Sequence, residues 1–421
     1  MTVSLTLSLL VFGATYVAIT LEKVHKTIAA LAGAVLMLLL GLISQERAFE
    51  HVDWNVIFLL AGMMIIANGL QQTGVFQFVA IQLVKAARAK PRQVLIYLAG
   101  FAALVSAVLD NVTTVVLVTP LVLFLAHALH ISPLPFLIAV ILASNIGGTA
   151  TLIGDPPNVI IGSAAGLDFA AFLVNLAPVA LLVFAVFVPT ILFLFRHDLR
   201  VDAETRAAVM ELDTAGVIKD RRMLAIALGV LGLVIVGFLL QGVFHYEAAT
   251  IALGGAVLIA LFEKRDIHEL LSEIEWTTLF FFFGLFIVVG ALIEVGLIEI
   301  MAHGLLGLTG GDLSLTTMLL LWLSGAASAI VDNIPYTATM VPIVQQLGAG
   351  MPSAPLWWAL ALGACLGGNA TLVGASANVI VAGLAERAGY PISFGAFLKY
   401  GLIITLESLL IASVYIWLRY L

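Results

Sequence analysis

Apolar runs of roughly 16 to 25 residues recur along the whole chain, and they constrain its fold more than any other feature. About 20 helical residues cross the ~30 Å hydrocarbon core of a bilayer, so runs of this length predict transmembrane helices. Hydrophobic residues make up 62% of the 421 residues and charged residues only 10%. A soluble domain could not cover so much apolar side chain with polar surface. The sequence therefore predicts an all-α polytopic membrane protein.

Several other classes of protein are not expected. The single cysteine, Cys365, excludes an intrachain disulfide framework and a multi-thiolate metal site. No nucleotide-binding loop, metal cluster or nucleophile with an adjacent base is visible, so we expect neither an enzyme nor a cofactor, and no nucleic-acid partner. The segment 1–20 lacks a basic stretch and a small-residue cleavage site, so we expect a first transmembrane helix and not a cleaved signal peptide.

The second half of the chain repeats the first. Aligning the sequence with itself at the Asp-Asn pairs brings Asp110-Asn111 onto Asp332-Asn333. Aligning it at the glycine-rich stretches brings 147–158 onto 367–378, where glycine, threonine and asparagine positions coincide. The two alignments differ by only two positions, and matches that keep their order over so long a segment indicate an internal duplication.

Each half is predicted to contain five transmembrane crossings and one re-entrant helical hairpin. The apolar stretches 94–127 and 316–347 are each interrupted by an Asp-Asn pair, and each arm is short for a full crossing. The predicted domains are a first repeat, 1–195, a cytoplasmic linker, 196–222, and an inverted second repeat, 223–421. The fold class expected is that of the ion transporter superfamily, with about 10 transmembrane helices, two hairpins and two broken helices.

The distribution of Lys and Arg independently supports an inverted second half. Cytoplasmic loops are enriched in these residues. With the N-terminus outside, 16 of the 18 Lys and Arg fall in segments expected in the cytoplasm, and only Arg47 and Arg419 lie elsewhere. The sequence therefore predicts a multi-pass protein of the bacterial inner membrane with both termini in the periplasm. The first hairpin then enters from the cytoplasm and the second from outside.

The hairpin tips carry the first candidate site residues. Asp110 and Asp332 fall at matched positions inside apolar segments, and an ionisable residue at membrane depth costs ~2.5 kcal/mol or more. This cost in free energy indicates that the two aspartates have a functional role. The alternative is that Asp and Asn only cap a helix start, where they satisfy free N–H groups. Both roles are compatible.

The stretches 147–158 and 367–378 carry the second set. Glycines permit unwound backbone, and Pro156-Pro157 prevents a continuous helix. Unwound backbone at membrane depth is tolerated only where protein buries it or a wet cavity borders it, and secondary transporters place their sites there. A glycine notch for helix packing is the alternative. The repeats differ at Asp155, which becomes Ala375.

These patterns give two groups of candidate residues. The predicted substrate-binding residues are Asn111, Thr113, Thr114, Gly147, Gly148, Thr149, Thr151, Asn158, Asn333, Thr337, Gly367, Gly368, Asn369, Thr371 and Asn378. The predicted proton- or ion-coupling residues are Asp110, Asp155, Asp332 and Glu407. No Lys or Arg is expected at membrane depth. The site is therefore expected to suit a cation or a small neutral hydroxylated solute, and not a free anion.

Three stretches also resemble a known family. Asp53 through Met63, Asp110 through Pro120 and Gly147 through Ile161 resemble signatures of the ArsB/NhaD permeases of the ion transporter superfamily. Relatives such as the melanosomal P protein are similar to the chain in the same way. The resemblance implies two hairpins and two unwound helices around one site, with alternating access. Dicarboxylate-carrying relatives have Ser-Asn-Thr at the tips, so Asp in place of Ser argues against a dicarboxylate here.

The function expected first is export of arsenite or antimonite, as neutral trihydroxides, by proton antiport. Side-chain amides and hydroxyls can pair with three solute hydroxyls, and the carboxyl groups would carry the proton. The alternatives are a NhaD-type Na⁺/H⁺ antiporter, a chloride or small-anion transporter, and a non-transporting membrane receptor. The lipid bilayer is the expected environment. An ArsA-type ATPase on the cytoplasmic face is implied by the resemblance alone.

Overall fold

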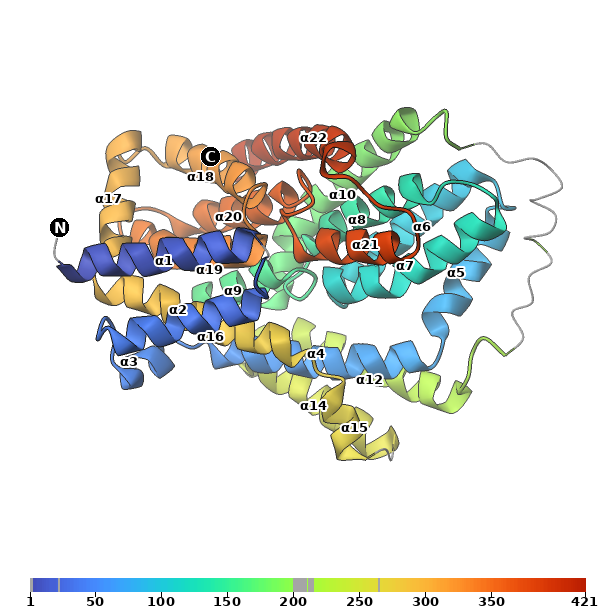
Figure 1. The fold of residues 1–421 in the computed structure, drawn as a ribbon, viewed down its shortest axis with the longest axis horizontal. Helices are drawn as coiled ribbons and strands as arrows, with labels where there is room; N and C mark the ends of the chain where they lie inside the picture. The colour runs from blue at the N-terminus through green and yellow to red at the C-terminus, as the bar shows by residue number, and fades with distance from the viewer. Residues whose placement is uncertain (1–2, 22, 200–209, 211–215, 264–265) are drawn as a thin grey trace.

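The computed structural model describes residues 3–21, 23–199, 210, 216–263 and 266–421. Within these ranges all regular secondary structure is helical, with no strand, which confirms the predicted fold class (Figure 1). The linker predicted over 196–222 lies for the greater part outside the described residues. The division at 195 and 223 stays a prediction, as does the side of the membrane that each terminus occupies.

The helices of the second half follow one another in the same order as the corresponding helices of the first half. The first half contains α1 (Val3–Leu21), α2 (Lys26–Leu39), α3 (Gln45–Glu50), α4 (Trp54–Gln72), α5 (Val75–Ala86), α6 (Pro91–Ser106), α7 (Asn111–Ala128), α8 (Leu134–Gly148), α9 (Pro156–Ala165) and α10 (Phe169–Leu194). The second half contains α12 (Arg221–Leu239), α13 (Gln241–Phe244), α14 (Ala248–Glu263), α15 (Ile267–Ser272), α16 (Trp276–Glu294), α17 (Leu297–Thr309), α18 (Leu313–Ser328), α19 (Asn333–Gly348), α20 (Ser353–Gly367), α21 (Ser376–Arg387) and α22 (Phe394–Tyr420).

Seven described helices are long and apolar enough to cross a membrane, namely α1, α4, α7, α10, α12, α16 and α22. The pair α17 and α18 is bent by 118° and could add one more. The other apolar helices are shorter, since the tips and the unwound stretches divide the apolar runs into pieces. The chain is therefore a multi-span membrane protein, as predicted.

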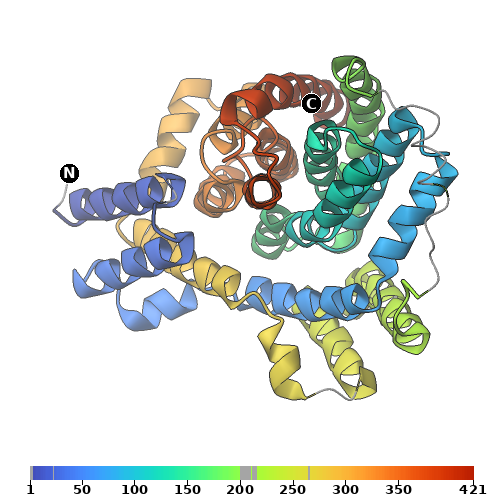
Figure 2. The same ribbon diagram turned by 45° about the vertical axis from the view of Figure 1, so that its right-hand side comes forward.

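The helices gather into two units that alternate along the chain. In Figure 2, α1–α4 and α12–α16 form an outer arc, which we call the frame. The helices α6–α10 and α18–α22 form a second group beside it, which we call the hairpin unit. Within the frame the halves exchange partners: α4 packs on α14 of the second half, and α16 packs on α2 of the first. The helices α5 and α17 connect frame to hairpin unit in each half.

In each repeat, the first arm of the hairpin packs on the helix that leads into the unwound stretch of the same repeat. The first hairpin arm, α6, lies along α8, and α18 lies along α20 in the same way. A Cβ at Gly147 would lie 2.1 Å from the carbonyl oxygen of Ala103, and one at Gly367 would lie 2.5 Å from that of Gly325. These matched glycines therefore allow two backbones to approach at equivalent points of the two repeats.

We predict that Gly147→Ala destabilises the protein, because the added methyl group must push α6 away from α8. Overpacking of this kind costs about 1–3 kcal/mol. The melting temperature of the detergent-solubilised protein should fall by several degrees. Gly304→Ala is the matched control, since a Cβ there has no neighbour within 4 Å. Equal melting temperatures for the two variants would contradict the close packing.

Candidate functional site

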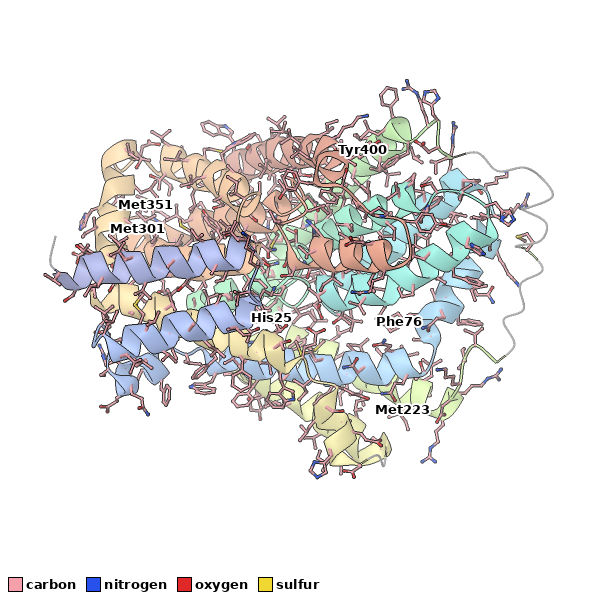
Figure 3. The ribbon with its side chains drawn as sticks, viewed as in Figure 1. His25, Phe76, Met223, Met301, Met351 and Tyr400 are labelled. Carbon is pink, nitrogen blue, oxygen red and sulfur yellow. The ribbon has the colours of Figure 1, made fainter. Side chains whose placement is uncertain are left out.

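A cavity of about 510 Å³ lies between the frame and the hairpin unit. The frame contributes the starts of α2 and α16 and the middle of α4 to its wall. The hairpin unit contributes both tips and both breaks. Figure 3 shows His25, which precedes α2, near the middle of the long axis of the molecule. The polar side chains of the wall are His25, Lys26, Thr27, Asp110, Thr113, Glu275, Thr277, Thr278 and Ser376.

Both tip aspartates cap the helix that follows them. The carboxylate of Asp110 accepts the backbone N–H of Thr113 at 2.7 Å and the hydroxyl of Thr113 at 2.6 Å. The carboxylate of Asp332 accepts the backbone N–H of Ile334 at 3.0 Å. Asp110 still faces the cavity. Capping and a role in the site are therefore compatible, as the sequence analysis allowed.

Each hairpin tip is joined to the neighbouring break by three hydrogen bonds, and the same three bonds are found in both repeats. They connect the backbone N–H after each tip aspartate to a carbonyl of the break, and a serine or threonine hydroxyl to a backbone carbonyl across the joint. In the first repeat they are Asn111 N to Gly154 O (3.1 Å), Ser106 Oγ to Ser144 O (2.7 Å) and Thr151 Oγ1 to Ala107 O (2.6 Å). In the second they are Asn333 N to Gly374 O (3.2 Å), Ser328 Oγ to Ala364 O (2.6 Å) and Thr371 Oγ1 to Ala329 O (2.6 Å).

Two buried asparagines satisfy carbonyl groups that the breaks release. The side-chain amide of Asn158 donates to the carbonyl oxygens of Thr151 at 2.8 Å and Thr149 at 3.2 Å. The amide of Asn378 donates to those of Gly368 and Thr371, both at 2.8 Å. The structure thus gives Asn158, Asn378 and the two break threonines a structural role. Their predicted role in binding a solute stays a prediction.

Asn145 connects the two repeats, and the sequence analysis did not find it. Its side-chain N–H groups donate to the Oδ1 atoms of Asn369 at 2.9 Å and Asn378 at 3.0 Å. Its own Oδ1 accepts from Asn111 at 3.1 Å. Aligning the repeats at the breaks places Cys365 at the equivalent position, so the repeat carried no signal for Asn145. Cys365 makes the equivalent but weaker contact, from its Sγ to Asn158 Oδ1 at 3.5 Å.

Asp155 is the most deeply buried of the four predicted coupling residues, with no exposed surface. Asn333 of the other repeat donates to both of its carboxyl oxygens, at 3.2 and 3.3 Å. No ion pair joins it to a Lys, Arg or His among the described residues. Asn111 lies beside Asp155. The buried Oδ1 atom of Asn111 accepts no hydrogen bond from any described residue. Burying an ionised carboxylate without a cation is costly, so Asp155 suits proton or cation binding.

Lys26 corrects the expectation that no Lys or Arg reaches the site. Its ammonium group lies 3.4 Å from Asp332 Oδ2 and donates to Ser376 Oγ at 2.6 Å. Lys26 was expected in a cytoplasmic segment, because it stands between two apolar runs. The 14-residue α2 is too short for a full crossing, and it begins at the cavity. Glu275, at the start of α16, also lines the cavity.

The remaining predicted residues fall into two groups. Gly148 and Gly368 lie at close backbone contacts within the breaks, and Thr149 bonds its own helix at Asn145 O. The buried hydroxyls of Thr114 and Thr337 have no partner among the described residues. Neither residue lines the central cavity, so their predicted role in binding a solute stays a prediction.

Glu407 lies apart from this cluster. It belongs to α22 and accepts the hydroxyl of Thr190 in α10 at 3.0 Å. It does not line the central cavity. Its role in proton or ion coupling therefore stays a prediction.

A second cavity of about 420 Å³ lies close to the first. Its wall includes Asn55 and Glu247, which the repeat relates to Thr277 and His25 of the first cavity. Because the sequence predicts inverted repeats, we expect the related cavities to face opposite sides of the membrane. Leu59 and Val159 line both cavities. The partition between the cavities therefore includes these two apolar side chains.

Comparisons with known proteins agree on a transporter. Residues 16–363 match the profile of the family described as citrate transporter, CitMHS. An uncharacterized transporter of Mycobacterium bovis is 46% identical over 418 residues, which cover 97% of both chains. The P protein of Homo sapiens is 34% identical over 482 residues, which cover 94% of this chain and 58% of that protein. The expected similarity to the P protein is thereby confirmed.

A solved structure shares the fold. The crystal structure of the YdaH transporter of Alcanivorax borkumensis, described as having an unusual topology, has a TM-score of 0.61. The match covers 98% of this chain and 96% of that chain at 15% sequence identity. At this identity the likeness concerns the fold alone.

We predict that Asn145→Ala both destabilises the protein and impairs transport. The substitution removes the acceptor of the Asn111 side-chain N–H and the donor to the Oδ1 atoms of Asn369 and Asn378. Each buried group left unsatisfied costs about 1–3 kcal/mol. Cys365→Ala, at the equivalent position, removes only weaker thiol contacts, to Asn158 Oδ1 and to the neighbouring Asp155 and Thr149, and is the comparison variant. Melting temperature and transport are measured for both. Similar losses in the two variants would refute a special role for Asn145.

Proposed function

The chain belongs to the citrate transporter family, CitMHS, and on this premise we propose that it exports neutral arsenite or antimonite from the cell in exchange for protons. That the chain is a membrane transporter of this family follows from the comparisons. The solute, the proton coupling, the closer kinship with ArsB/NhaD permeases and a position in the bacterial inner membrane with both termini in the periplasm belong to the proposal.

The charge of the cavity supports a neutral solute. Asp110 and Glu275 line its wall, and Asp332 lies behind Ser376, whereas Lys26 is the one Lys or Arg among the lining residues. Lys26 is already paired with Asp332. An anion carrying several charges, such as citrate, would meet more carboxylate than ammonium here and would be repelled. A trihydroxide can instead donate hydrogen bonds to carboxylate and accept them from hydroxyl groups.

The cavity wall also offers a simple route to antiport. An ionised Asp110 can accept hydrogen bonds from a solute hydroxyl, whereas a protonated Asp110 has lost part of that acceptor capacity. Solute and proton then compete for the same carboxyl group. Because Asp110 faces the cavity, it can exchange protons with water there. Competition of this kind is what exchange of solute for protons requires.

A small anion with a single charge is the second candidate, and Lys26 is the observation that favours it. An ammonium group at the wall can dock a carboxylate or a halide if it leaves Asp332. The family description names citrate as a transported anion. The excess of carboxyl groups around Lys26 places this candidate second.

Purified protein in proteoliposomes tests the proposal directly. With an acidic interior, the vesicles should accumulate arsenite, measured by mass spectrometry of arsenic, and an ionophore that dissipates ΔpH should abolish the uptake. Parallel vesicles receive Na⁺ or citrate in place of arsenite. No ATP is present, so uptake would also mean that an ATPase partner is dispensable. Proton efflux driven by Na⁺ or citrate but not by arsenite would overturn the proposed solute.

We predict that Asp110→Asn uncouples arsenite movement from ΔpH, because an amide cannot take up or release the proton. Exchange of labelled arsenite across the membrane should persist, while ΔpH-driven accumulation should be lost. Asp312→Asn is the matched control, since Asp312 caps α18 through Leu315 N at 2.7 Å but lies outside the cavity. Full ΔpH-driven accumulation in Asp110→Asn would remove this carboxyl group from the coupling mechanism.

A further inference from the structure

The ammonium group of Lys26 occupies a position built by the second hairpin and the second break. Asp332 Oδ2 accepts the hydroxyl of Ser376 in a short hydrogen bond, so the two oxygens lie side by side. Lys26 Nζ lies 3.4 Å from the first and 2.6 Å from the second. It also lies 5.0 Å from the centre of the Phe281 ring. The cation therefore contacts two oxygen atoms and an aromatic face.

The contact is made across the two units of the molecule. Lys26 and Phe281 belong to the frame, in α2 and α16. Asp332 and Ser376 belong to the hairpin unit. The side chains of Lys26 and Asp332 are only 26% and 13% exposed, so solvent screens this pair less than a surface pair. Glu275 also faces Lys26 and adds a second negative charge to its surroundings.

The first repeat lacks such a cation. Aligning the repeats at the tips places Ala248 opposite Lys26. Aligning them at the breaks places Pro156 opposite Ser376, so the hydroxyl is missing too. Asp110 accordingly forms its hydrogen bonds with Thr113 and has no ion pair among the described residues. Of the two tip aspartates, one is open to the cavity and one is occupied by an amine of the chain itself.

We propose that Lys26 is a tethered cation that fills the position beside Asp332 and Ser376 and thereby excludes Na⁺ from it. Carboxylate and hydroxyl oxygens are ligands that hard monovalent and divalent cations share, and a lysine ammonium group carries the same charge as Na⁺. Because the amine is attached beside its site, its effective concentration there is in the millimolar range or higher. A free ion must first displace it. Lys26 therefore determines which cation the transporter can use.

This inference goes beyond the proposed function, since it concerns the cation at Asp332 and not the solute. A binding measurement tests it without any arsenite. The melting temperature of the purified protein is followed while NaCl replaces choline chloride at constant ionic strength. The wild-type melting temperature should not change, whereas that of Lys26→Met should rise saturably by several degrees, because Na⁺ then binds the folded state.

Three variants sharpen the measurement. Lys26→Arg keeps the positive charge and should stay insensitive to Na⁺. Lys23→Met removes an exposed lysine three positions earlier in the chain and should behave as the wild type. The double variant Lys26→Met with Asp332→Asn should lose the response to Na⁺, which would assign the ion to Asp332.

Three outcomes would overturn the proposal. The first is a saturable rise with Na⁺ in the wild type, and the second is no rise in Lys26→Met. The third is failure of both Lys26→Met and Lys26→Gln to fold while Lys26→Arg folds, since the ion pair would then hold the fold together and not exclude an ion. Failure of arsenite transport leaves this test unaffected, so the two proposals fail separately.

Discussion

A helix that breaks at membrane depth must have its released backbone groups satisfied by the protein, and the rest of this structure depends on that constraint. Without water, each unpaired N–H or C=O costs several kcal/mol, so the partners have to be built in. Here the hairpin tip supplies one set through Asn111 N and Asn333 N, and the asparagines of the breaks supply the other. The hairpins therefore reach the centre of the molecule because the breaks need them there. The same joints bring the tip aspartates to the cavity.

Features with a local chemical signal could be predicted from the sequence. Asp-Asn pairs in apolar segments and glycine-rich stretches at matched spacing mark the tips and breaks without any knowledge of tertiary structure. Asn145 could not be predicted, because it stands inside an apolar helix and its repeat partner is Cys365. The place of Lys26 at the cavity could not be predicted either, because hydropathy shows where an apolar run ends but not how deep that end lies. The apolar run 27–44 is itself long enough to suggest a crossing, and only the structure shows that its helix ends at Leu39.

The two repeats agree in the bonds that hold the backbone and in the tip aspartates, but they differ at two other charged positions. Three joints between tip and break recur with nearly equal distances. By contrast, Asp155 matches Ala375 and Lys26 matches Ala248. Backbone geometry has to be preserved for either half to fold, whereas a single transport site between the halves does not need the same side chains from both. Divergence is accordingly found at side chains around the cavity, such as Lys26, and not at the joints.

The partition formed by Leu59 and Val159 has an electrical consequence. We expect the two cavities to open to opposite sides of the membrane, and water that fills them would then hold each cavity near the potential of its own compartment. The membrane voltage then falls mainly across the thin apolar layer between them and not evenly over the bilayer. Moving one elementary charge through 100 mV is worth about 2.3 kcal/mol. A carboxyl group beside such a layer needs only a small displacement, past one or two side chains, to draw on most of that energy.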